Sequence, residues 1–159
     1  MAILVSDGEN SPLCRFLRQN LPGWIFEADT PLFCFPGDAP LPLTPPKECI
    51  FIADASFFLP AVTENIRVLT CGRSPKDTFT FSAKSEDSAS VALMRAVSTP
   101  EGIIEPMEVP VDFPKGTGDL AVLGTVAVRI LTGALPNGRL RLYPPAPKRP
   151  YWKNGFKSE

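Results

Sequence analysis

Two short runs of consecutive apolar residues constrain the fold of this chain more than any other feature of its sequence. They are CIFIA at residues 49–53 and IRVLTC at residues 66–71. A strand with one face in water alternates apolar and polar side chains, whereas a continuous apolar run is typical of a strand covered on both faces. The two runs therefore predict a central, partly parallel sheet in an α/β domain.

The first 30 residues resemble the opening of an α/β unit. An apolar run at 3–5 ends in the turn residues Ser6-Asp7-Gly8, and Ser11-Pro12 matches a helix N-cap followed by proline at the first helical position. We expect a strand at 3–5, a helix that stops within residues 20–23, and a second short strand at 24–26.

Residues 31–46 contain six prolines. Proline removes a backbone donor and fixes φ, so regular structure is not expected to run through this segment. We predict an extended surface loop there.

A β-rich region follows. Thr99-Pro100-Glu101-Gly102 has the composition of a β-turn, and apolar residues alternate from 103 to 113, which predicts a strand paired with residues 88–97. Pro106, Pro110 and Pro114 share one parity along that strand. Their missing N–H groups should face one edge of the strand, which is predicted to be open.

The clearest helix follows Gly116-Thr117-Gly118-Asp119, where Thr117 or Asp119 could provide the cap, and it should end at Gly133. The predicted fold class is thus α/β: a small mixed-sheet domain with a helix near each end and a β-hairpin addition at 78–113. The 159 residues are enough for one domain, which we place at 1–142. A proline-rich, basic and aromatic tail occupies 143–159.

The composition excludes several chemistries. The chain has no histidine, which rules out Ser-His-Asp triads, Cys-His dyads and imidazole metal sites. Its four cysteines, Cys14, Cys34, Cys49 and Cys71, include no C-x-x-C pair, so we expect buried reduced thiols rather than zinc ligands. The first residues lack a signal-peptide pattern and no apolar run has the length of a membrane span, so a cytoplasmic protein is expected.

Four motifs occur in a recognisable order. Ile52-Ala53-Asp54-Ala55 ends one apolar run, VLTCG at 68–72 ends the next, a β-rich stretch follows, and an Ala/Val/Leu-rich helix ends in Leu-Thr-Gly at 131–133. In this order and spacing, residues 49–136 resemble part of the central domain of the Mur ligases, the bacterial enzymes that add amino acids to peptidoglycan precursors with ATP.

The departures from the family are as informative. No G-K-[ST] phosphate loop occurs, and Gly116-Thr117-Gly118 stands where the family has Gly-His-Asn. Phosphoryl transfer needs a phosphate cradle, a lysine and a metal. We therefore expect a non-catalytic domain without cofactor, metal or catalytic residues. It would serve as an interaction or regulatory module linked to cell-wall precursor metabolism in a bacterial cytoplasm.

Five residues are candidates for ligand binding: Asp54, Gly72, Arg73, Lys76 and Thr117. In the ligases, the loop that matches 72–77 lies near the nucleotide base and ribose, so the resemblance implies weak nucleotide or nucleotide-sugar binding through Arg73 and Lys76. A free helix N-terminus at Thr117 could bind an anion. Each also has a purely structural interpretation: a strand end, a solvated turn or an ordinary helix entry.

Three alternatives remain open. A small enzyme could use carboxylates such as Asp7 and Asp54 near the carboxyl end of the sheet, and Asp54, Asp77 and Glu86-Asp87 could cluster around a metal or be scattered surface charges. Residues 138–159 carry a net charge of +5, against -6 for residues 1–137. This tail could contact another protein or a second copy of the chain; a nucleic-acid partner is not expected, and neither is a membrane.

Overall fold

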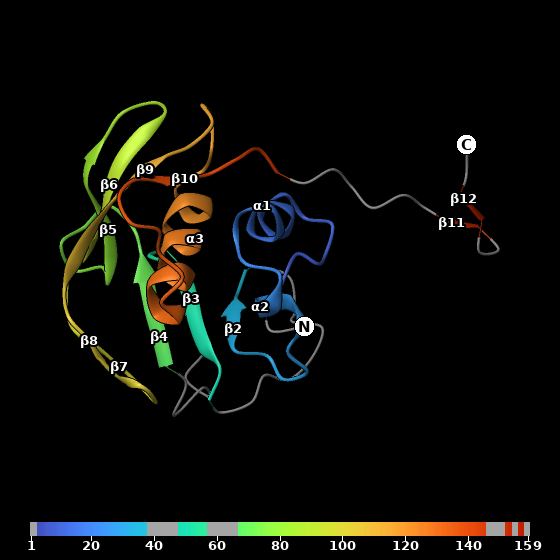
Figure 1. The fold of residues 1–159 in the computed structure, drawn as a ribbon, viewed down its shortest axis with the longest axis horizontal. Coiled ribbons are helices and arrows are strands. Elements are labelled where there is room, and N and C mark those ends of the chain that lie inside the picture. Colours follow the sequence, from blue (N-terminus) through green and yellow to red (C-terminus); the bar gives the residue numbers. More distant parts are fainter. Residues whose placement is uncertain (1–2, 38–47, 57–66, 146–151, 154–155, 158–159) are drawn as a thin grey trace.

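An eight-stranded mixed sheet organises the computed structural model, which describes residues 3–37, 48–56, 67–145, 152–153 and 156–157 (Figure 1). The strand order is β1-β2-β3-β4-β5-β6-β9-β10. These strands are β1 (Ile3–Val5), β2 (Phe33–Phe35), β3 (Ile50–Asp54), β4 (Arg67–Cys71), β5 (Phe79–Lys84), β6 (Ser88–Leu93), β9 (Met107–Asp112) and β10 (Leu140–Arg141). The predicted α/β mixed-sheet class is confirmed.

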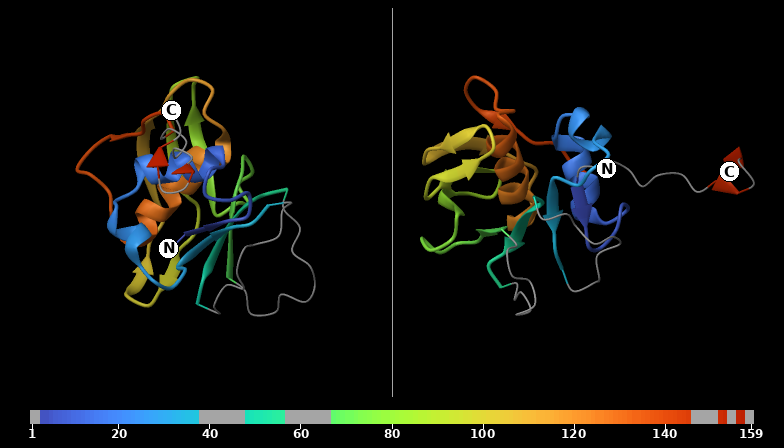
Figure 2. Two further views of the ribbon diagram at one scale, coloured as in Figure 1. Left: turned by 90° about the vertical axis from the view of Figure 1, so that its right-hand side faces the viewer. Right: turned by 90° about the horizontal axis from the view of Figure 1, so that it is seen from below.

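The sheet has a parallel half and a largely antiparallel half. Strands β1 to β5 are parallel to their neighbours, whereas β5, β6 and β9 pair antiparallel. The predicted pairing of the 88–97 region with the 103–113 region is confirmed by β6 and β9. Beyond them, β7 (Val97–Thr99) and β8 (Gly102–Ile104) form a separate hairpin that continues the same ribbon past the sheet (Figures 1 and 2).

Two predictions in the parallel half are wrong. Residues 24–27 form the short helix α2 (Trp24–Glu27) rather than a strand. One helical turn buries Ile25 completely and leaves Trp24 exposed, and the backbone N–H of Phe26 bonds to the carbonyl of Gly23.

The segment 31–46 is not loop throughout, because β2 lies within it between β1 and β3. Pro31 and Pro36 flank this strand without entering it, so its three residues keep all their backbone donors. All three side chains are buried, which adds apolar area to the sheet. Residues 38–47 of the predicted loop lie outside the described part of the chain.

One face of the sheet packs against α1 (Pro12–Asn20) and α3 (Asp119–Thr132), which contact each other (Figure 1). The predicted cap of α1 is confirmed: Ser11 accepts a hydrogen bond from the N–H of Cys14, and Pro12 occupies the first turn. The C-terminal end of α3 is at Gly133, whose φ of 70° is left-handed, as the sequence predicts.

The opposite face of the parallel half is also buried. Leu4, Cys34, Cys49 and Phe51 form a second apolar cluster there. In β3, the neighbouring residues Phe51 and Ile52 point to opposite faces and both are buried. The continuous apolar run at 49–53 therefore marks a doubly covered strand, as its pattern predicts. All four cysteines are free and buried, in agreement with the expected reduced thiols.

The proline-bearing edge of β9 is only partly as predicted. The N–H of Phe113 bonds to Asp87 on the β6 side, so Pro110 and Pro114, of the other parity, face away from β6. That edge is not open, however. The two-residue strand β10 pairs with it in parallel, and the N–H of Leu142 bonds to the carbonyl of Asp112. Asp112 lies between the two prolines and has a normal backbone, so a short strand fits there.

A polar node joins α1, α3 and the segment after β10. The side-chain amide of Asn20 donates to the carbonyls of Phe16 and Tyr143, each at 2.9 Å, and its oxygen accepts the N–H of Tyr143 at 2.6 Å. Arg129 donates through Nε and Nη2 to the carbonyl of Asn20 and through Nη1 to that of Ala134. Asn20 is buried, so these bonds fix two helices and the chain after β10 in one arrangement.

The tail region contains two further two-residue strands, β11 (Trp152–Lys153) and β12 (Phe156–Lys157), which pair antiparallel. None of the helices in the described parts of the chain has the length and apolarity needed to span a lipid bilayer.

Candidate functional site

The loop 72–78 contains three of the predicted site residues and connects two staggered parallel strands. Strand β5 begins beside the end of β4, and only Cys71 and Phe79 are paired. The N–H of Gly72 bonds to the carbonyl of Phe79 at 3.1 Å. This stagger lets a seven-residue loop join parallel neighbours that would otherwise need a long crossover. The loop is therefore part of the sheet's construction.

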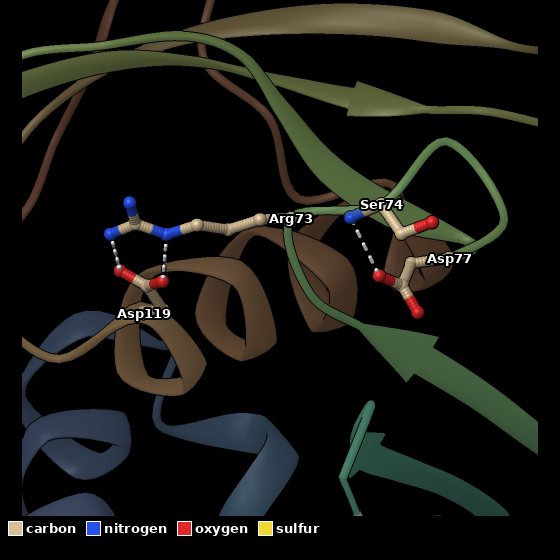
Figure 3. Close-up of polar contacts among 4 residues, drawn as sticks. All are labelled: Arg73, Ser74, Asp77 and Asp119. Atoms are coloured by element: carbon tan, nitrogen blue, oxygen red, sulfur yellow. Dashed lines mark hydrogen bonds and ion pairs between the residues drawn. The ribbon is translucent and has the colours of Figure 1, made fainter.

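Gly72 is required by close packing inside this loop. A Cβ on Gly72 would lie 2.8 Å from the Cβ of Ala55 and would overlap the carboxylate of Asp77. That carboxylate is buried and accepts the N–H of Ser74 at 3.0 Å (Figure 3). Arg95 holds the outside of the loop by donating to the carbonyls of Pro75 and Lys76. Gly72 thus has a structural role that accounts for its presence.

Arg73 is engaged by a residue 46 positions away. Its Nε lies 2.7 Å from Oδ2 of Asp119 and its Nη2 lies 3.2 Å from Oδ1, a two-pronged ion pair (Figure 3). The hydrogen bond from Arg73 lowers the pKa of the Asp119 carboxyl below its usual range. Asp119 is the first residue of α3, so its negative charge also occupies the position where an anion would meet the helix dipole.

Lys76 and Thr117 make backbone-directed contacts. The backbone N–H of Lys76 donates to the hydroxyl of Ser74, and Lys76 is exposed. Thr117 does not cap α3: its hydroxyl donates to the carbonyl of Pro114 at 2.6 Å, and Gly118 is the N-cap without a side-chain bond. The predicted cap by Thr117 or Asp119 is therefore wrong, because Pro114 and Arg73 engage these two side chains.

Asp54 lies at the carboxyl end of β3, beside the start of the same loop. Its Oδ1 accepts both the N–H and the hydroxyl of Ser56. Burial, and then the nearby carboxylates of Asp77 and Asp54, raise the pKa of the Cys71 thiol. The structure therefore brings Asp54, Gly72 and Arg73 to one end of the sheet, but each is held by its neighbours. Within the described residues, no three acidic or cysteine side chains are grouped as metal ligands.

The Arg73–Asp119 pair predicts a pH-dependent stability effect. The folded-state pKa of Asp119 is depressed below 3.8, so the ionised carboxylate stabilises the fold near neutral pH, and this contribution is lost as pH falls through the folded pKa. Asp119→Asn should slightly lower the Tm near pH 7, and the difference from wild type should shrink as the pH falls through the depressed folded-state pKa of Asp119. Arg73→Gln should behave alike and should add nothing to Asp119→Asn. A difference that persists in acid would show that the pair is not its origin.

A surface groove lies beside β6, β9 and β10, at the end of the sheet opposite β1, and the sequence analysis did not identify it. It consists of two adjoining depressions of about 430 and 350 Å³ that share Ser88 and Arg139. Arg141 and Asp87 line the larger one, and Lys84 lines the smaller one. From the sequence, Arg139 and Arg141 belong to the basic C-terminal segment. Their alternation around Leu140 is the signal that they share one face of a strand.

Comparison of the chain with protein-family models, with curated proteins and with solved structures finds no significant match.

Proposed function

We propose that this chain is a non-catalytic interaction module, related to the central domain of the Mur ligases and acting in cell-wall precursor metabolism in a bacterial cytoplasm. One observation carries this proposal. The cation that would contact a nucleotide, Arg73, forms a two-pronged ion pair with Asp119 at the start of α3. A helix N-terminus next to a free cation favours phosphate, whereas this one is already neutralised by the chain's own residues.

The remaining reactive groups support the same proposal. The sequence contains no histidine to act as an acid or base at neutral pH. Burial raises the pKa of Cys34 to about 12 and that of Cys49 to about 11, so these thiols stay protonated and poorly nucleophilic. The chain's chemistry thus favours binding over turnover.

The order of elements is compatible with the resemblance. Strands β3 and β4 are followed by the antiparallel β5, β6 and β9 and then by the apolar helix α3 that ends before Gly133. An order of elements concerns the fold, and fold by itself does not carry function. The link to cell-wall precursors is therefore proposed from the motifs at 52–55, 68–72 and 131–133.

A second candidate, weak nucleotide or nucleotide-sugar binding at Arg73 and Lys76, is favoured by exposure. The side chain of Arg73 is 68% exposed, and an ion pair in water contributes little stability. A phosphate could therefore displace Asp119 at small cost. No such observation favours the carboxylate enzyme: Asp7 follows β1 and Asp54 ends β3, and β2 lies between these strands.

A phosphate-release assay with Mg-ATP tests the non-catalytic role. We expect no release above the buffer rate, for wild type and for Asp54→Ala alike, because a phosphate loop is absent from the sequence. ATP hydrolysis that disappears on Asp54→Ala would overturn the proposal.

Thermal unfolding with UDP and UDP-muramyl compounds tests the second candidate. A ligand at 100 times its Kd should add about 2.7 kcal/mol, and a site at Arg73 and Lys76 requires that both alanine variants abolish the shift.

A further inference from the structure

The groove between the β5–β6 turn, β9 and β10 differs in charge from the body around it. Three cations, Lys84, Arg139 and Arg141, and two carboxylates, Asp87 and Asp112, line its two depressions. Residues 1–137 carry a net charge of -6, so the two arginines that follow this acidic part of the chain and line one depression are a local exception. Such an exception raises the local concentration of anions.

Arg139 is oriented by an acidic neighbour that engages only part of its guanidinium. Its Nε lies 2.8 Å from Oδ1 of Asp112, and no hydrogen bond from its terminal nitrogens occurs within the described chain. Asp112 therefore fixes the direction of the side chain while the outer fork stays available. A guanidinium fork matches the oxygen spacing of phosphate and carboxylate groups.

Arg141 adds a second cation beside the first. Arg141 is opposite Asp112 in the β9–β10 register and is exposed. Its side chain has no ion-pair or hydrogen-bond partner among the described residues. Arg139 and Arg141 line the same depression together with Ser88, whose hydroxyl lies 2.7 Å from that of Ser85. The groove thus offers two guanidinium groups and a hydroxyl within one hollow.

Lys84 also lines the smaller depression, but its ammonium is turned toward the helix-bearing side of the sheet, where its charge helps to lower the pKa of the Asp119 carboxyl at the start of α3. Its Nζ lies 5.7 Å from the ring centroids of Phe81 and of Phe113, the distance of a cation–π contact. The one carboxylate in the groove without an ion pair in the described chain is Asp87. Its charge opposes an incoming anion, which gives the groove a residue whose removal should strengthen binding.

We propose that this groove binds the phosphoryl group of a small molecule, held by Arg141 and by the outer fork of Arg139. A phosphate monoester carries nearly two negative charges and three acceptor oxygens, so it can accept hydrogen bonds from both guanidinium groups and from a hydroxyl and balances two arginines better than a singly charged carboxylate does. The larger depression, about 430 Å³, has room for the phosphoryl group and a part of the molecule that carries it. This proposal goes beyond the non-catalytic role and does not require a site at Arg73.

Titration of the full chain with inorganic phosphate, UDP and uridine, followed by NMR or calorimetry, tests the site. We expect phosphate and UDP to bind and uridine not to bind. Arg141→Ala should weaken both ligands about tenfold or more, the loss of one charge-assisted hydrogen-bonded contact. Arg141→Lys, which keeps the charge but not the fork, should weaken them less. Asp87→Asn should strengthen binding by removing the opposing charge.

Lys115→Ala is the matched control, because Lys115 is 72% exposed, pairs with Glu86 and does not line the groove. It should leave the affinities unchanged, and the Tm of each variant without ligand reports any loss of fold. No binding of phosphate or UDP, or binding unaffected by Arg141→Ala, would overturn the proposal. A UDP effect lost in Arg73→Ala instead would place the ligand at the other candidate site, and ATP turnover would contradict only the non-catalytic role.

Discussion

Asn20→Ala should lower the free energy of unfolding by about 2–4 kcal/mol, because it removes three hydrogen bonds made by a buried side-chain amide. The side chain of Asn20 is buried and makes three hydrogen bonds, two of them to the backbone of Tyr143, 123 residues away in the sequence. Its loss leaves the N–H and C=O of Tyr143 unpaired in a partly buried position. Urea denaturation of the full chain measures this change.

The control for this prediction is Gln19→Ala, one residue earlier in the last turn of α1 and exposed. It changes helix propensity by little and should stay within about 0.5 kcal/mol of wild type. Arg129 is the other side chain of the same polar node. Burial lowers the pKa of Arg129, and its acceptors there are carbonyls rather than a carboxylate. If Asn20→Ala is as stable as Gln19→Ala, the node does not hold the helices together.

Gly124→Val should be nearly as damaging, at about 2–3 kcal/mol, through overpacking of the core. Gly124 lies in the middle of α3, where a Cβ would sit 2.6 Å from Cε1 and 3.3 Å from Cζ of Phe35. Both residues are buried, and Phe35 lies in β2, which has a strand on each side. The ring therefore has little room to move, and thermal or urea unfolding should report the strain.

Two further variants identify the cause of this effect. Ala121→Val, on the same helix and only partly buried, measures the helix-propensity cost of valine, which is below about 1 kcal/mol. Phe35→Leu combined with Gly124→Val should restore part of the lost stability, because the smaller side chain vacates the space that the new methyl groups need. Equal effects of valine at positions 121 and 124 would contradict the close-contact explanation.

The elements that the sequence predicts well are those set by neighbouring residues. Ser11 caps α1 within three residues, Gly133 ends α3 through its own backbone conformation, and the turn at 99–102 joins β7 to β8. The apolar run at 49–53 predicts β3 because each side chain reports the covering of its own face. The parity of Pro110 and Pro114 likewise predicts which edge of β9 they face.

The wrong predictions concern contacts made between distant residues. Proline content suggested a loop at 31–46, yet packing against the helices favours a strand at Phe33–Phe35. The open edge of β9 is covered by Leu140–Arg141, which the sequence assigns no pairing. Local pattern does not distinguish a one-turn helix from a short strand at 24–26, and the tertiary packing of Ile25 determines the helix.

The sequence by itself determined the α/β class, the strands β1, β3 and β4, and the chemistries that a chain without histidine lacks. The tertiary structure decided which charges remain available. Arg73 is engaged by Asp119 from α3, whereas Arg141 is left without a partner among the described residues. The reason is physical: a side chain's electrostatic environment depends on distances of a few ångströms, and these are set by the packing of α3 and β10 against the sheet.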